Sequence, residues 1–200
     1  MSDSLAISCK CGEVTGTLHD VGPDKGDRYV CYCSDCRDFI HLLGRQDDVL
    51  DAHGGTAVYQ TRVAKLELNT GIDKLATVRL TQKPTTRWYA ACCNTPFFNT
   101  INKAKPPFLS VITECCDAER RDSVLGPSRG DVSAQEAMPP LQSAKPVSNF
   151  RMLSRVMRRI FRDTWSGDWK LSPLFDMETR KPITEARRVT AEERTRLDQA

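Results

Sequence analysis

The sequence predicts a mainly β fold, in which an antiparallel β domain is followed by a helical C-terminal extension. Short runs of β-branched residues fill the chain up to residue 113, and Gly, Pro, Asn or Asp bounds each run. A polar stretch rich in Pro and Gly follows, and a segment with helical periodicity begins after it. These changes predict a β domain over residues 5–115, a loop or linker over 116–148 and an extension over 149–200.

The expected strands are short and alternate between apolar and polar residues. A period of two is typical of sheets with one face exposed to solvent. Between the second and third of these strands, Asp35 to Leu43 is expected to form one or two helical turns. The strands are expected at residues 14–18, 29–30, 56–60, 65–68, 76–80 and 109–112.

The C-terminal extension contains the strongest helical pattern of the chain. Apolar residues recur at spacings of three and four across residues 149–164, and five arginines occupy the other faces. The motif Thr190-Ala191-Glu192-Glu193 has the form of a capping box, which predicts a short terminal helix.

Seven of the nine cysteines fall in three tight clusters. Thiolates separated by one or two residues can bind a single Zn²⁺ at about 2.3 Å per bond, so each cluster is a candidate part of a metal site. We therefore predict zinc as a cofactor, at about one or two ions per chain. The clusters are Cys9-Lys10-Cys11, Cys31-Tyr32-Cys33-Ser34-Asp35-Cys36 and Cys92-Cys93.

Disulfide pairing is the first alternative use of so many cysteines. However, the start of the chain, MSDSLA, lacks the basic residues and apolar run of a secretory signal, and no stretch approaches the roughly 18 apolar residues of a membrane span. These observations predict a cytoplasmic protein without a transmembrane segment, in which thiols stay reduced. Buried structural thiols are the second alternative, which we prefer for Cys115 and Cys116.

The cysteine triplet supplies three ligands within six residues, too short a span to close a four-coordinate site alone. Catalytic zinc has three protein ligands and one exchangeable position, whereas structural zinc has four. The triplet is therefore either a candidate catalytic site or a structural site completed by a distant residue such as Cys116 or His41. Its members are Cys31, Cys33 and Cys36.

The other two clusters are far apart in the chain, and each supplies a pair. Such pairs are typical of a structural zinc that joins distant segments, here Cys9 and Cys11 with the pair Cys92-Cys93. Adjacent side chains on an extended strand point to opposite faces. We therefore expect one of Cys92 and Cys93 to bind the metal and the other to pack.

The order and spacing of these motifs resemble the glutathione-dependent formaldehyde-activating enzyme (GFA) family. The resemblance covers roughly residues 5 to 115 and rests on Cys9-Lys10-Cys11-Gly12, on residues 31–37 and on residues 87–96. It implies an open, tent-like antiparallel β fold, stabilised by zinc, with two zinc sites. Cys9, Cys11 and the late cysteine pair would hold a structural zinc, while Cys31, Cys33 and Cys36 would hold the zinc associated with activity.

The late motif departs from the family pattern C-x-x-C-G-T-P. Cys93 matches the second cysteine, but Ala90 stands at the first, and Asn94 replaces the glycine. Asn tolerates the left-handed backbone that glycine usually supplies, so the turn is expected to survive. The missing ligand implies either that Cys92 takes its place or that the site has three cysteines and a substitute.

The resemblance implies a carbon-sulfur lyase activity on a small thiol–aldehyde adduct, with glutathione as co-substrate. An open zinc site suits this chemistry because it lowers the pKa of a bound thiol. Three thiolates leave such a site at a charge of about −1, which favours positioning a thiolate over polarising a carbonyl. Arg37 and Arg87 are nominal partners for the carboxylates of glutathione. Three residues near the triplet could relay a proton, namely Asp35, Asp38 and His41.

The alternative function is a non-catalytic, zinc-stabilised binding module whose basic helix docks on an acidic partner or a membrane surface. The 29 basic and 26 acidic residues give a net charge of +3, too balanced to predict nucleic-acid binding. For the helix itself, we prefer the interpretation that its apolar stripe packs on the β domain or on a second subunit of a homo-oligomer, with its arginines solvated.

Overall fold

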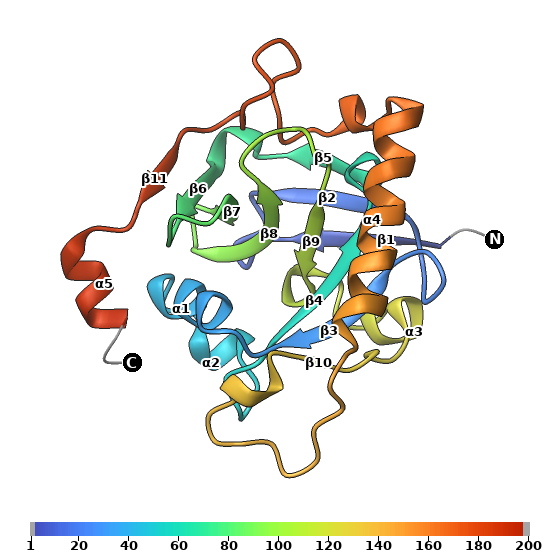
Figure 1. Ribbon diagram of the computed structural model, residues 1–200. Helices are drawn as coiled ribbons and strands as arrows, with labels where there is room; N and C mark the ends of the chain where they lie inside the picture. Colours follow the sequence, from blue (N-terminus) through green and yellow to red (C-terminus); the bar gives the residue numbers. More distant parts are fainter. Residues whose placement is uncertain (1–2, 198–200) are drawn as a thin grey trace.

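In the computed structural model, which describes residues 3–197, the fold is mostly β-sheet with a few helices (Figure 1). The mainly β class expected from the sequence is thus confirmed. Residues 198–200, the end of the expected extension, lie outside the described residues. No helix between residues 3 and 197 has the length and apolar character needed to cross a membrane.

The smaller sheet is antiparallel and has the strand order β1-β2-β5. It is formed by β1 (Asp3–Ser8), β2 (Thr15–Val21) and β5 (Leu66–Thr70). The turn between β1 and β2 carries the first cysteine cluster, so the end of this hairpin positions one half of a candidate metal site.

The larger sheet has the order β10-β3-β4-β9-β8-β7-β6-β11, and its six inner strands pair in antiparallel fashion. Its two edge strands, by contrast, pair in parallel with β3 and β6. The strands are β3 (Asp27–Cys31), β4 (Thr56–Thr61), β6 (Leu75–Arg79), β7 (Thr85–Ala90), β8 (Thr95–Ile101), β9 (Leu109–Ile112), β10 (Asp131–Val132) and β11 (Ala186–Arg188).

Both edge strands come from beyond residue 115. β10 lies in the stretch expected to be a linker, and β11 lies in the C-terminal extension. The later segments of the chain therefore complete the sheet that the earlier ones begin. The domain boundaries at residues 115 and 148 stay a prediction.

The helices are α1 (Ser34–Leu42), α2 (Gln46–Val49), α3 (Arg121–Leu125), α4 (Asn149–Ser166) and α5 (Ala191–Leu197). The helices expected after the cysteine triplet, at residues 149–164 and after Thr190 are therefore present. The capping box is formed as well. The Glu193 N–H donates to Thr190 Oγ1 at 3.1 Å, and the Thr190 N–H donates to the Glu193 carboxylate at 2.8 Å.

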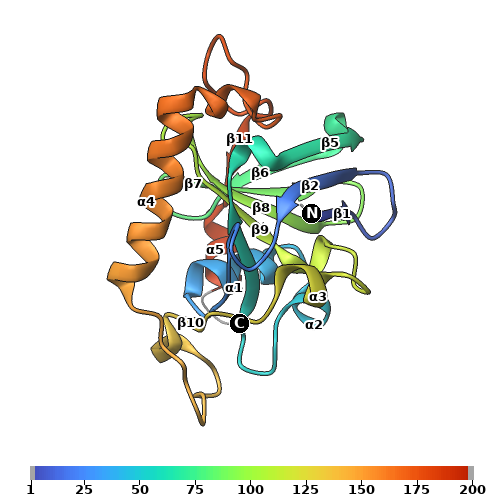
Figure 2. The ribbon, with the colours of Figure 1, turned by 90° about the vertical axis from the view of Figure 1, so that its right-hand side faces the viewer.

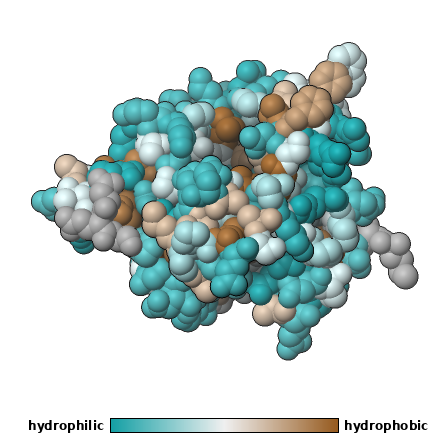
Figure 3. All heavy atoms as spheres, turned by 60° about the horizontal axis from the view of Figure 1, so that its bottom comes forward, coloured by the Kyte–Doolittle hydropathy of each residue, from teal (hydrophilic) through white to brown (hydrophobic). Residues whose placement is uncertain are grey.

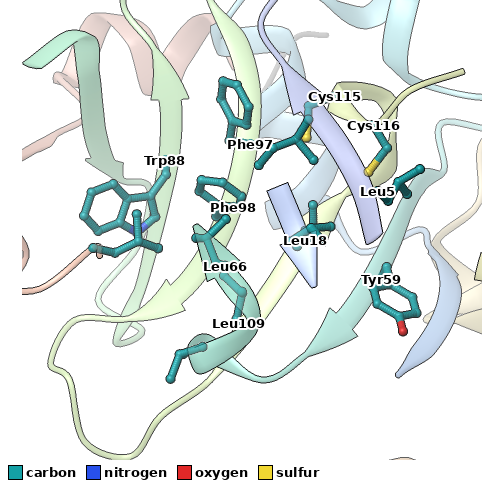
Figure 4. Packing of buried hydrophobic residues seen from close by; sticks show 14 of the residues in the cluster. Leu5, Leu18, Tyr59, Leu66, Trp88, Phe97, Phe98, Leu109, Cys115 and Cys116 are labelled. Carbon is teal, nitrogen blue, oxygen red and sulfur yellow. The ribbon is translucent and has the colours of Figure 1, made fainter. Parts of the chain in front are cut away.

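The larger core unites apolar side chains from both sheets (Figure 4). Leu5 and Leu18 from the small sheet pack with Trp88 and Phe98 from the large one. Cys115 and Cys116 are buried in the same core, as expected for structural thiols. A second core packs α1 on the large sheet, and its members include Tyr29, Phe39, Ile40, Val78 and Ile112.

Helix α4 is oriented opposite to expectation. Arg155 and Arg159 turn toward the β domain and pair with the buried Asp27, and Asp163 pairs with Arg62. The interpretation in which the apolar stripe packs on the β domain is therefore wrong, because the stripe is exposed and the ionic side of α4 has buried partners there instead. Packing on a second subunit stays a prediction. The exposed apolar residues of α4 are Phe150, Leu153, Met157, Phe161 and Trp165.

Candidate metal sites

Two hairpin turns bring four cysteines from distant parts of the chain together. Cys9 and Cys11 lie in the turn between β1 and β2, and Cys92 and Cys93 lie in the turn between β7 and β8. Their four sulfur atoms all lie within 4.8 Å of one another. Cys11 and Cys92 are 3.3 Å apart, Cys9 and Cys11 3.4 Å, and Cys9 and Cys92 3.9 Å.

These distances fit a closed tetrahedral zinc site. Four sulfurs placed tetrahedrally at about 2.3 Å from one ion lie about 3.8 Å from each other. The turn of the first pair also supports thiolate ligands, because the Val14 N–H donates to Cys9 Sγ at 3.3 Å. Gly12 makes this turn possible with a φ of 79°, a conformation that glycine adopts without strain.

The adjacent cysteines reach the same site because they are not on a strand. Residues 91–94 form the turn between β7 and β8, so the alternation of an extended strand does not apply to Cys92 and Cys93. The expectation that the two thiols point apart assumed an extended backbone, and it is wrong because the backbone there forms a turn. Asn94 has a φ of 55°, which confirms that it takes the left-handed conformation expected at this position.

Thr95 joins the two turns through its hydroxyl. The Lys10 N–H donates to Thr95 Oγ1 at 3.0 Å, and the same oxygen lies 3.2 Å from Cys93 Sγ. Burial alone would raise the pKa of Cys93, but hydrogen bonds from Thr95 and from the Cys11 backbone lower this pKa to about 6. These hydrogen bonds therefore favour the thiolate form of Cys93, which is the form that a metal ligand requires.

The second group of thiols lies where β3 meets α1. Cys31 ends β3, Cys33 is the N-cap residue of α1, and Cys36 lies in the first turn of this helix. Their sulfurs all lie within 4.8 Å of one another, with 3.4 Å between Cys31 and Cys33. Cys36 is buried, whereas Cys31 and Cys33 are partly exposed, so the group is reached from solvent on the side opposite Cys36.

Within residues 3–197, no fourth Cys, His, Asp or Glu joins this triplet. His41 lies in the last turn of α1, and Cys116 lies in the larger core, where it bridges to Ile7 of β1. Neither of the two distant residues considered from the sequence therefore completes the site. Three protein ligands and an accessible side match the donor set of an open zinc site.

A buried arginine contacts the triplet from the large sheet. Arg87 Nη1 lies 3.6 Å from Cys36 Sγ and donates to Asn99 Oδ1 at 3.0 Å, and the guanidinium stacks on Phe39. Hydrogen bonds from Cys31 and Cys33, together with the charge of Arg87, hold the pKa of Cys36 well below its usual value. The arginine thus offsets the negative charge of about −1 that three thiolates leave on a divalent ion.

Two of the three residues considered for proton relay, the aspartates, are engaged elsewhere. Asp35 pairs with Lys83 at 2.6 Å, and Asp38 pairs with Arg194 of α5 at 3.0 Å. Burial raises the pKa of Asp38 despite its arginine partner. Arg37, considered for binding glutathione, donates to the Glu136 carbonyl oxygen at 3.0 Å.

Comparison with known proteins identifies the family. Residues 1–187 match the model of a family of unknown function, DUF6151. The chain belongs to this family. The match includes both cysteine groups and extends through α4 into β11, so most of the chain after residue 115 belongs to the family unit.

Two further comparisons concern curated proteins and solved structures. A search of curated proteins finds no match. Among solved structures, a crystal structure of a Rhodobacter sphaeroides protein, determined in a structural genomics programme, is similar. It has 18% sequence identity and a TM-score of 0.40, and the similarity covers 56% of this chain and 88% of that one.

The sequence of this DUF6151 member did not indicate the contact of Arg87 with Cys36, and Arg87 was considered instead as a partner for the carboxylates of glutathione. Its neighbours in β7, Thr86 and Trp88, are buried as well, because both faces of this strand are covered. A strand covered on both faces shows no alternation that would assign a side chain to solvent or to the core. The available signal was a charged residue within a run of otherwise uncharged strand residues.

Proposed function

We propose that this DUF6151 member holds two zinc ions, a structural one at the four-cysteine group and a reactive one at the triplet. We further propose that it is a carbon-sulfur lyase that acts on a thiol–aldehyde adduct, with glutathione as the thiol. The proposal rests on the contrast between the two groups. One has four sulfurs, whereas the other has three, with two partly exposed members and no fourth protein ligand in the described chain.

The reaction makes or breaks one carbon-sulfur bond. A zinc ion at an open thiolate site lowers the pKa of an incoming thiol and keeps it as a thiolate. In the forming direction, the thiolate sulfur bonds to the aldehyde carbon, the carbonyl π electrons move to the oxygen, and this oxygen takes a proton. The reverse direction returns that proton and breaks the carbon-sulfur bond.

The residues around the triplet have separate roles in this proposal. Arg87 stabilises the buried thiolates from the side of Cys36. Lys83 is exposed and paired with Asp35, two residues from Cys33, and is placed to bind a carboxylate of the thiol substrate. Hydrogen bonding to Asp35 raises the pKa of Lys83, so this side chain stays charged for such a role.

The resemblance to the GFA family supports this choice of reaction. The three cysteine motifs occur in the family's order, and they assemble into two groups of sulfurs, as a two-zinc protein requires. We accordingly propose the tent-like fold of that family for the β domain. We also propose a cytoplasmic location, where thiol ligands remain reduced.

Cobalt substitution tests whether the triplet is open. Cobalt bound to thiolates has visible absorption bands that change when a new ligand enters the coordination sphere. We expect millimolar glutathione to change this spectrum in the wild type and in Cys11→Ser, and to leave Cys33→Ser unchanged. The protein should then accelerate exchange between formaldehyde and its glutathione adduct, as measured by NMR exchange spectroscopy.

Two results would reject the proposal at different steps. If glutathione leaves the spectrum of the fully loaded protein unchanged, the triplet is closed, and the non-catalytic binding module becomes the better account. If the spectrum changes but adduct exchange is no faster than in buffer, the triplet binds thiols without lyase activity on this adduct.

A further inference from the structure

Helix α4 is attached to the molecule by its charged side. Arg155 Nη1 lies 2.9 Å from Asp27 Oδ1, and Arg159 Nη1 lies 2.7 Å from Asp27 Oδ2. Farther along the helix, Asp163 Oδ1 lies 2.5 Å from the Nε atom of Arg62. Both aspartates are 1% exposed, so the inward face of α4 is fixed by buried ionic contacts.

The outward face of α4 is an apolar ridge, which we call the α4 ridge. Its five large side chains are between 50% and 83% exposed, and the rings of Phe161 and Trp165 stack on each other. α4 lies at the outer edge of the molecule, and hydrophobic side chains project from the corresponding edge of the surface (Figures 2 and 3). The ridge consists of Phe150, Leu153, Met157, Phe161 and Trp165.

The ridge residues are spaced by three or four positions, so they form one line along the helix. At 1.5 Å per residue this line is about 22 Å long. A continuous exposed apolar surface of this kind marks an interaction site, unlike scattered single apolar residues.

Arginines form one border of the ridge. Arg151, Arg158 and Arg162 each follow a ridge residue by one position, which places them on the same side of it. Within residues 3–197, neither Arg158 nor Arg162 has an ion-pair partner. These cations are therefore available to an external anion.

A cavity of about 330 Å³ adjoins this border. Arg158, Arg159 and Arg162 line it together with Lys25 and Lys65, and the acidic residues of its wall are Asp20, Asp24 and Asp27. Those acids are already paired with other basic groups of the wall. The Nη2 atom of Arg159 is buried without a hydrogen-bond partner, so the cavity retains unsatisfied donor capacity.

The distribution of charge decides what covers the ridge. A second copy of the chain would bring another α4, whose one acidic residue, Asp163, is buried against Arg62. It would therefore add arginines to the border and no exposed carboxylate. An anionic lipid surface instead offers acyl chains to the ridge and phosphate groups to the arginines.

We propose that the α4 ridge lies in the interface of an anionic lipid bilayer, with the arginine border and the adjoining cavity receiving lipid phosphate groups. The convex shape of the ridge suits a fluid surface, into which Phe, Leu and Trp side chains can insert while the arginines reach the headgroups. This docking is independent of the reaction at the triplet, so either proposal can fail without the other.

Vesicle binding by the zinc-loaded full chain tests this proposal. The vesicles contain phosphatidylcholine alone, or phosphatidylcholine and phosphatidylserine at about 2:1. We expect sedimentation with the anionic vesicles only, weakened by salt. Trp88 and Trp169 are buried, so a blue shift of tryptophan fluorescence on binding reports on the exposed Trp165.

Matched variants separate the ridge from general surface effects. Phe161→Ser should weaken vesicle binding about tenfold, whereas Met138→Ser should not, although Phe161 and Met138 are 66% and 65% exposed. Arg162→Glu should weaken binding and reduce its dependence on salt more than Arg120→Glu, since Arg120 is also exposed but lies at the start of α3 and not on α4.

Three outcomes would overturn the proposal. The first is no binding to either kind of vesicle, or equal binding by Phe161→Ser and Met138→Ser. The second is a dimer that Phe161→Ser dissociates, without vesicle binding, which would assign the ridge to a second copy. The third is ridge-dependent binding of a polyglutamate peptide without vesicle binding, which would assign it to an acidic polypeptide.

Discussion

The sulfur atoms of Cys11 and Cys92 lie 3.3 Å apart, although 81 residues separate them in the chain. Cys11 belongs to a hairpin turn of the small sheet, and Cys92 belongs to a hairpin turn of the large sheet. A metal ion shared by these thiols would therefore join the two sheets at their turns. This position explains why the four-cysteine group is expected to stabilise the fold. The triplet, by contrast, lies at the start of a single helix.

The two groups should differ in their effect on stability. We expect Cys11→Ser to lower the free energy of unfolding by at least about 2 kcal/mol more than Cys33→Ser, because a structural metal contributes directly to folding. Thermal melts of the two zinc-loaded variants measure this difference. Neither side chain is fully buried, so the loss of packing in either substitution should lower the free energy of unfolding only slightly. Equal losses, or a larger loss for Cys33→Ser, would contradict the assignment.

Cys92 and Cys93 should both be needed for the structural zinc. Their sulfurs lie with those of Cys9 and Cys11 in one group, so Cys92→Ser and Cys93→Ser should each reduce the zinc content by about one ion per chain. Cys116→Ala, in the larger core, is the control and should keep the full content. If Cys92→Ser keeps both ions and costs only about 1 kcal/mol, Cys92 is a packing residue.

Arg87 should set the zinc affinity of the triplet. Removing its charge from beside Cys36 should lower that affinity about tenfold, because groups that support metal ligands contribute on this scale. Competition with a chromophoric chelator measures the affinity of Arg87→Gln. Arg62→Gln removes another buried arginine, one that contacts Asp163 rather than a thiol, and should destabilise the fold but leave the triplet affinity unchanged. Equal affinities for the two variants would show that Arg87 acts only in packing.

Asp27 should hold α4 on the β domain. Three arginines, Arg129, Arg155 and Arg159, converge on its buried carboxylate, so Asp27→Asn removes the charged partner that they share. We expect the free energy of unfolding to fall by about 3 kcal/mol and the amides of α4 to exchange hydrogen faster. The control is Asp122→Asn, which removes the ion pair between the exposed Asp122 and Arg28 and should lower the free energy of unfolding by less than about 1 kcal/mol. Unchanged exchange in α4 would show that other contacts hold this helix.

Much of the secondary structure could be predicted from local patterns. Alternating residues predicted β4, β6 and β9. The helical periodicity predicted α4, and the capping box predicted α5. The edge strands β10 and β11 have two and three residues, too few to form a pattern. They exist because β3 and β6 offer open edges, which is a tertiary effect.

The direction in which α4 faces could not be predicted from its periodicity. A helical pattern shows which residues share a face, but not which face turns inward. Asp27 and Arg62 decide that, and they are more than 100 residues away from their α4 partners. The cysteine spacing likewise predicted which thiols cluster locally. The sequence also predicted that Cys9 and Cys11 meet Cys92 and Cys93, and the structure achieves this by placing the hairpin turns of the two sheets side by side.

The metal content of the purified full chain tests the central claim most directly. After expression in zinc-replete medium, we expect elemental analysis to find two zinc ions per chain, one for each group of thiols. Cys11→Ser and Cys33→Ser should each retain one ion, and the double variant should retain none. A wild-type chain without zinc, or a zinc content that neither substitution changes, would contradict the assignment of these cysteines as two metal sites.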